Sequence, residues 1–510
     1  MRLILVLALC VFTFAACSGP TDPTTAAYWL EKLEQPAERA TALTELGKIG
    51  DKSVLPEVIK WFEEDGPWQP DAAYALGRLG DKTTVSILTA GIDYTVGTGT
   101  DKRTRAKNRT NLNIAKAIAE LKAGDGVEAL VRMLNLPDLS AKEGIIRSLG
   151  KLGDSRAAEP LIKIASTESH PFIRKTAIQA LGDLGDPKAV PTLIDGLFTE
   201  LPGVSFYYEA RYSLLQIGNA AVPTLIETLE RKNTSVEAIR LPSGTGIAPG
   251  AIEGKAGFVL GALRAVEAEK QMLKALDNYY GQYQNRAREQ IFASVPGAVA
   301  ELAYSLGQLG SDLSVRTLSS IASEQDANLR AAGAEALTTL GATQAAGTLV
   351  AAGKTGDFAA KRSAIEAAAM LGNAELIASL EALGQGSDDA AKAIADVVTA
   401  NKPPLEAAGE CKSDATCWAG KAKDANIKVR KRVAYQLGWL GSKESIAQLT
   451  TLAEDDSASV RMAAMASLSR LGGADAAALQ AIYDKWNKKI EYKNSNQELK
   501  RLIARSRSAN

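Results

Sequence analysis

The phrase Leu-Gly-x-Leu-Gly-Asp recurs along the chain, and this recurrence constrains the fold more than any other feature. It stands at residues 46–51, 76–81, 149–154 and 181–186, with isoleucine in place of the second leucine in the first copy. Neighbouring copies lie 30 to 33 residues apart, a period typical of helical hairpins. Weaker copies end at six further glycines, namely Gly218, Gly310, Gly341, Gly372, Gly441 and Gly472. Because one short hairpin cannot bury its apolar side alone, we predict an all-α chain, an α-solenoid of stacked helical hairpins with one continuous core.

Residues 171–198 show how one hairpin is expected to form. Two apolar stripes with helical spacing identify its two helices: Ile173, Ala177, Ala180, Leu181 and Leu184 in the first, and Val190, Leu193, Ile194 and Leu197 in the second. Between them, Gly185 suits a left-handed position that ends a helix. Asp186 can cap the next helix, and Pro187 suits that helix's first position.

The extended pattern of this unit resembles HEAT repeats, in the short form first noted in phycobilin lyases. The matching residues are Arg174, Ala177, Ala180, Leu181, Gly182, Leu184, Gly185, Asp186, Ala189, Val190, Pro191, Leu193 and Ile194. The resemblance covers most of residues 36–482. It implies an array of HEAT-like hairpins that we divide into residues 36–232 and 258–482, separated by a Gly/Pro-rich insertion at residues 233–257. The bilin lyases are the enzymatic precedent of this family, but fold alone does not assign an activity.

The N-terminus carries features of an export signal. Arg2 precedes an apolar run at residues 3–14, and Ala15-Ala16-Cys17 follows. This ending resembles a bacterial lipobox, which implies a signal peptide at residues 1–16, acyl chains on Cys17 and a lipidated tether at residues 17–35. Ser18 resembles the second residue of lipoproteins that are sent to the outer membrane. An ordinary secretory signal is the alternative.

The remaining cysteines agree with export. Cys10 lies in the expected signal peptide, so Cys411 and Cys417 remain beside Cys17. An even pair at short spacing in an oxidising compartment favours a disulfide, with two free thiols as the alternative.

Three segments depart from the repeat and are candidates for partner binding. Residues 92–111 are expected to form a loop with the basic residues Lys102, Arg103, Arg105, Lys107 and Arg109. This loop is either solvated or an anionic docking site. The cluster Tyr279, Tyr280 and Tyr283 either packs between helices or forms a binding hot spot. Residues 483–510 form a basic cap or tail that closes the solenoid or contacts an anionic envelope polymer.

No constellation of residues indicates catalysis. The chain has one histidine, His170, which cannot build a zinc site alone. The aspartates that end the repeated phrase are expected to cap helices. The 59 basic and 59 acidic residues balance, which gives no general attraction to nucleic acid. We therefore expect no cofactor and no metal, and a non-enzymatic scaffold, anchored to the outer membrane, that binds envelope proteins in the periplasm. A carrier or sensor of a small ligand or envelope polymer, and a lyase-like enzyme, are the alternatives.

Overall fold

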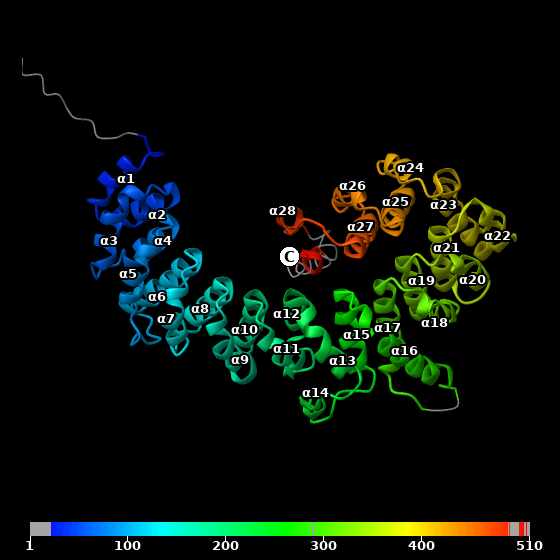
Figure 1. The fold of residues 1–510 in the computed structure, drawn as a ribbon, viewed down its shortest axis with the longest axis horizontal. Coiled ribbons are helices and arrows are strands. Elements are labelled where there is room, and N and C mark those ends of the chain that lie inside the picture. Colours follow the sequence, from blue (N-terminus) through cyan, green and yellow to red (C-terminus); the bar gives the residue numbers. More distant parts are fainter. Residues whose placement is uncertain (1–21, 288–289, 488, 490–498, 504–505, 507–510) are drawn as a thin grey trace, which may run out of the picture. The chain divides into compact units, whose positions relative to one another are not determined.

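The computed structural model describes residues 22–287, 290–487, 489, 499–503 and 506. These residues form two compact units that divide after Pro160, and the described part of each is almost entirely helical (Figure 1). The predicted signal peptide and Cys17 lie outside the described residues. The Gly/Pro-rich segment at residues 233–257, where we expected the array to divide, lies inside the second unit.

Each repeat pairs a first helix with a second helix, and the first is the longer of the two in every described pair except α15 and α16. The first helices are α2 (Arg39–Ile49), α4 (Gln69–Leu79), α6 (Lys102–Glu120), α8 (Leu139–Leu152), α10 (Pro171–Leu184), α12 (Tyr207–Ile217), α15 (Ala251–Leu263), α17 (Val295–Leu309), α19 (Ala327–Leu340), α21 (Phe358–Leu371), α23 (Asp389–Cys411), α25 (Ile427–Leu440) and α27 (Ala458–Leu471). The second helices are α3 (Leu55–Glu63), α5 (Val85–Ala90), α7 (Val127–Met133), α9 (Ala158–Thr167), α11 (Val190–Gly196), α13 (Val222–Leu229), α16 (Glu269–Gln284), α18 (Val315–Ile321), α20 (Ala346–Ala352), α22 (Ile377–Glu381), α24 (Ala415–Gly420), α26 (Ile446–Leu452) and α28 (Ala476–Trp486).

The remaining elements are short. Two helices, α1 (Ala26–Leu33) and α14 (Thr234–Ala238), lie outside the pairs, and a hairpin joins β1 (Glu200–Leu201) to β2 (Val204–Ser205). Single 3-10 turns occur at η1 (Lys52–Val54), η2 (Lys82–Thr84), η3 (Gly124–Gly126), η4 (Ser155–Ala157), η5 (Pro187–Ala189), η6 (Gly218–Ala221), η7 (Val266–Ala268), η8 (Asp312–Ser314), η9 (Thr343–Ala345), η10 (Ala374–Leu376), η11 (Ala382–Gly384) and η12 (Lys443–Ser445).

The first glycine of the repeated phrase brings neighbouring first helices together. A Cβ atom on Gly77 would lie 2.6 Å from the Cα of Ala117, and one on Gly307 would lie 2.6 Å from the Cα of Ala336. Real side chains do not tolerate such distances. Glycine at this position therefore allows α4 to pack on α6, and α17 to pack on α19, backbone against backbone.

The second glycine and the aspartate turn the chain between the two helices. Gly80 has a φ of 74° and ends α4 in the left-handed conformation, which a residue with a side chain adopts at a cost. The carboxylate of Asp81 then accepts a hydrogen bond from the backbone N–H of Thr83 at 2.9 Å. Asp51, Asp154 and Asp186 cap the following turn in the same way. These aspartates are helix caps, as predicted.

The core predicted for residues 171–198 is confirmed. Leu181, Leu193, Ile194 and Leu197 are fully buried, and the remaining predicted positions are buried except for half-buried Leu184.

The structure corrects two boundaries. Helix α1 lies inside the predicted tether at residues 17–35, because Thr25 caps it and Leu33 is buried. Helix α15 begins inside the predicted insertion at residues 233–257, because Glu253 closes a capping interaction with the backbone of Gly250.

An arginine near the start of several first helices fastens the preceding turn, which the sequence pattern alone did not explain. Arg174 donates from Nε to the carbonyl of Ala165 at 2.9 Å. Arg330 is fully buried, and its guanidinium donates to the carbonyls of four residues at the ends of α18 and α20, namely Ser323, Glu324, Ala352 and Thr355. Carbonyls at a helix C-terminus run out of intrahelical donors, and the charged guanidinium supplies hydrogen bonds to them.

Candidate binding surface

The predicted basic loop is a helix. Lys102, Arg103, Arg105, Lys107 and Arg109 lie in the first half of α6, where the side chain of Asp101 accepts a hydrogen bond from the N–H of Thr104 and begins the helix. Three of these side chains form ion pairs within the first unit, and Arg103 lies 3.8 Å from a carboxylate oxygen of Asp65. Lys107 forms an ion pair with Asp65 at 2.6 Å, and Arg109 forms one with Asp71. The prediction of a loop was therefore wrong from residue 102 onward, whereas residues 92–101 form neither helix nor strand. Part of the positive charge of this segment is already neutralised.

The tyrosine cluster does not form an exposed surface. Tyr279, Tyr280 and Tyr283 lie on α16 with 5%, 6% and 4% of their surface exposed. The hydroxyl of Tyr279 donates to the buried carboxylate of Glu253 at 2.8 Å, and that of Tyr280 donates to Glu324 at 2.7 Å. Burial and these carboxylates raise the pKa of both phenols. These tyrosines hold helices together, so the alternative of a binding hot spot is wrong for them.

Cys411 and Cys417 are joined as a disulfide at the end of α23. The bond closes the turn that leads into α24. Trp418, which follows, is fully buried and donates from its indole N–H to the carbonyl of Lys412 at 2.9 Å. The disulfide and this tryptophan therefore fix the same turn.

Exposed aromatic side chains occur at the starts of two adjacent first helices in the second unit. Phe172 on α10 is 65% exposed, and Tyr208 on α12 is 62% exposed. The two helices pack directly on one another. The guanidinium of Arg211 lies 5.3 Å from the Tyr208 ring. Large exposed apolar side chains in neighbouring repeats are typical of an interaction surface.

A hollow of about 230 Å³ lies beside Tyr208. Five of its lining residues come from α10 and α12, and two come from the C-terminal segment: Gln179, Tyr208, Glu209, Arg211, Tyr212, Lys500 and Arg501. One carboxylate oxygen of Glu209 pairs with Lys175 at 3.2 Å. The other, Oε2, is buried and accepts no hydrogen bond within the part of the chain that the structure describes. The hollow is thus lined by two tyrosines and by Glu209, whose Oε2 has no hydrogen-bond partner in the described part of the chain.

Ionisable groups with shifted pKa values lie on the next two first helices, α15 and α17. Lys255 on α15 donates to the carbonyl of Leu197 at 3.0 Å and lies against the rings of Phe198 and Tyr207. Burial lowers the pKa of Lys255 and raises the pKa of Glu301 on α17, although each charge partly offsets the effect on the other. Shifted groups on one surface are a feature of functional sites, although structural ion pairs also produce them.

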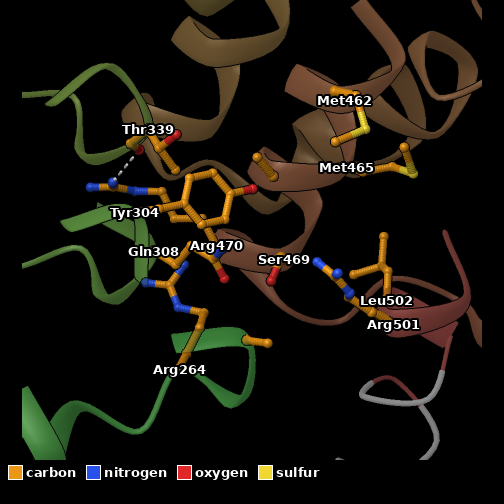
Figure 2. Close-up of a pocket in the computed structure, with 12 residues that line it drawn as sticks. Arg264, Tyr304, Gln308, Thr339, Met462, Met465, Ser469, Arg470, Arg501 and Leu502 are labelled. Atoms are coloured by element: carbon orange, nitrogen blue, oxygen red, sulfur yellow. Dashed lines mark hydrogen bonds between the residues drawn. The ribbon is translucent and has the colours of Figure 1, made fainter. Parts of the chain in front are cut away.

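A second, smaller hollow of about 60 Å³ lies where the last repeats meet α15, α17 and α19 (Figure 2). Its lining residues are Ala262, Arg264, Tyr304, Gln308, Thr339, Met462, Met465, Ala466, Ser469, Arg470, Arg501 and Leu502. Arg470 on α27 donates to the carbonyl of Leu340 at 2.8 Å, and Arg264 donates to that of Leu309 at 3.1 Å. Both arginines therefore cap the C-terminal ends of helices, where cations are favoured.

We use the name first-helix face for the surface that carries these groups, defined by Phe172, Gln179, Tyr208, Glu209, Tyr212, Phe258 and Tyr304. Its two hollows are smaller than the roughly 300–1,000 Å³ of small-molecule pockets. A wider hollow of about 550 Å³ lies elsewhere, around α25 and α26, and Arg430 there pairs with both Asp455 and Asp456. The aromatic and ionic groups of the first-helix face suit a macromolecular partner better than a small ligand.

Two structural features are absent from the described part of the chain. None of its helices combines the length and apolar content that a bilayer span requires. No group of three or more His, Cys, Asp or Glu residues in this part is arranged to hold a metal ion.

The family model for HEAT repeats matches residues 103–175, 159–240 and 420–490. No curated protein matches the sequence. Among solved structures, the complex of CpcE and CpcF of phycocyanin lyase from Nostoc sp. PCC7120 is 22% identical, with a TM-score of 0.23, over 54% of this chain and 94% of that one. Yeast importin-beta is 11% identical, with a TM-score of 0.43, over 92% of this chain and 72% of that one. Human deoxyhypusine hydroxylase is 18% identical, with a TM-score of 0.21, over 57% of this chain and 96% of that one.

The repeat geometry and the three family matches define the class of protein, an α-helical solenoid. More particularly, residues 103–240 and 420–490 consist of HEAT repeats.

Proposed function

We propose that this protein is a scaffold of the bacterial cell envelope that is anchored through lipid on Cys17 and binds protein partners through its first-helix face. The observation that carries the binding role is the pair of exposed aromatic residues in adjacent repeats, Phe172 and Tyr208, beside a hollow with an unsatisfied carboxylate oxygen. Aromatic side chains supply large contact area at protein interfaces and often dominate the binding energy.

The binding role is tested by capture from detergent-solubilised membranes. We expect the double variant Phe172→Ser and Tyr208→Ser to lose a partner that the wild-type chain retains, because the variant removes the exposed apolar area. The matched control is Val266→Ser with Leu313→Ser, since these residues are each 58% exposed in the same unit but lie on the 3-10 turns η7 and η8. Equal capture by all three proteins would show that this face does not bind the partner.

The anchoring role is tested at Cys17. The sequence Ala15-Ala16-Cys17 after an apolar run supports lipidation. We expect Cys17→Ser to move the exported chain from the membrane fraction to the soluble fraction. The serine variant cannot carry the several acyl chains that stable anchoring needs. Mass spectrometry of the wild-type N-terminal peptide should show the acyl groups. An unmodified wild-type cysteine, together with a variant that still sediments with membranes, would overturn the anchor.

A further inference from the structure

The C-terminal segment at residues 499–503 lies between the last repeats and much earlier helices of the same unit. Leu499, Leu502 and Ile503 are 2%, 6% and 1% exposed and belong to the core cluster of α25, α27 and α28. Arg501 points the other way, and its guanidinium carbon lies 4.6 Å from the centre of the Phe258 ring on α15. The segment is thus anchored by aliphatic side chains while one arginine reaches the first-helix face.

The surface under Arg501 has the chemistry that recognises a guanidinium. Phe258 stacks with Tyr304 of α17, with ring centres 6.3 Å apart and planes 15° from parallel. Arg501 lines the smaller hollow of this face (Figure 2), and together with Lys500 and Glu209 it also lines the hollow beside Tyr208. Aromatic faces and a carboxylate together bind arginine in proteins, through cation–π contact and charge-assisted hydrogen bonds.

We propose that this part of the first-helix face is a docking surface for an arginine-bearing segment of a partner protein, with aliphatic residues beside the arginine, and that residues 499–503 occupy the surface until the partner displaces them. The inference rests on the proposed scaffold function and specifies the segment that the scaffold binds. The resident segment supplies the argument for this chemistry, since it presents Arg501 between Lys500 and Leu502. A tethered segment competes at high effective concentration, so a partner gains access only by replacing the same contacts.

The test uses the purified full chain and a fluorescent synthetic peptide with the sequence of residues 497–507. A detached variant replaces four residues of the segment with serine: Leu499, Arg501, Leu502 and Ile503. None of these lies in a repeat helix, and circular dichroism checks that the helices persist. We expect this variant to bind the peptide at least about tenfold more tightly than the wild-type chain, because the tethered competitor is gone.

Two matched changes show whether the peptide uses the inferred contacts. In the detached background, Phe258→Ala should weaken peptide binding at least about tenfold, because it removes the aromatic face under the arginine. Phe358→Ala should leave binding unchanged, since this side chain is 47% exposed at the start of another first helix, α21. A peptide with glutamate in place of the arginine should not bind.

Equal peptide affinity of the wild-type and detached chains would overturn the proposal, as would binding that Phe258→Ala leaves intact. This assay contains no partner protein. A negative peptide result would therefore contradict only the docking proposal and not partner capture through Phe172 and Tyr208. Conversely, a failure to capture a partner would contradict the scaffold function without changing a positive peptide result.

Discussion

At the residue scale, glycine has two separate physical roles in the repeated phrase. The second glycine adopts a positive φ, which the sequence predicted at Gly185 and the structure confirms at 72°. The first glycine permits close contact between first helices, and only the structure shows the partner atoms. The partner belongs to the next repeat, so no local pattern identifies it.

The need for glycine where two first helices touch predicts opposite effects for two alanine substitutions in one helix. Gly307→Ala should destabilise the chain by about 1–3 kcal/mol, because the new Cβ would meet the backbone of Ala336. Gly297 also lies in α17, but a Cβ atom there would meet nothing within 4 Å. Gly297→Ala should therefore stabilise the protein by up to about 1 kcal/mol, because alanine lowers the conformational entropy of the unfolded chain and has a higher helix propensity. Thermal unfolding midpoints of the two variants test this, and midpoints that shift in the same direction would contradict it.

At the element scale, the aspartate caps predict a dependence of stability on pH. Hydrogen bonds from Ser53, from Thr83 and from the side chain of Arg156 hold the pKa values of Asp51, Asp81 and Asp154 below the ordinary value. Because the folded pKa is lower than the unfolded one, the stabilisation is complete above the unfolded value, and it is lost as the pH falls through both values.

The triple variant Asp51→Asn, Asp81→Asn and Asp154→Asn keeps a side-chain acceptor at each cap but removes the titrating group. Between about pH 5 and pH 3, the unfolding midpoint of the wild-type chain should therefore fall more steeply than that of the variant. Thermal melts across this range measure the difference. Parallel curves would show that the caps do not contribute through their charge.

The disulfide is a second feature at this scale. Peptide mapping of the exported protein without reductant should find Cys411 linked to Cys417, and two alkylatable thiols would contradict the assignment. Replacing both with serine should cost about 2 kcal/mol, since the bond closes a short loop of the unfolded chain. The loss should be local to α23 and α24, which hydrogen exchange can follow because each repeat contacts mainly its neighbours.

Element boundaries separate what the sequence could predict from what it could not. The spacing of Ile173, Ala177 and Leu181 identified a helix and its buried side correctly. Residues 102–109 were mistaken for a loop, since their polar composition hides a helix that Asp101 caps and that extends to the apolar residues around Ile114. The residues of the first-helix face were not predicted, because Tyr208, Phe258 and Arg501 come together only through the fold.

At the scale of the whole molecule, the array supplies a long series of first helices, and the second unit uses them in two ways. Toward its C-terminal end, α27 packs on α17 and α19, which covers part of that surface with the chain's own last repeats (Figure 1). Around α10 and α12 the face keeps Phe172 and Tyr208 exposed. Partner binding is therefore expected at residues 171–304 of this unit.

The most direct test of the scaffold function places a photo-crosslinking amino acid at position 208 of the full chain in intact producing cells. We expect a discrete adduct with a second protein, which weakens when Phe172 is replaced with serine and which is absent when the crosslinker stands at position 313. Two results would contradict binding through the first-helix face. In the first, a folded and exported chain forms no protein adduct from position 208; in the second, it forms the same adducts from positions 208 and 313.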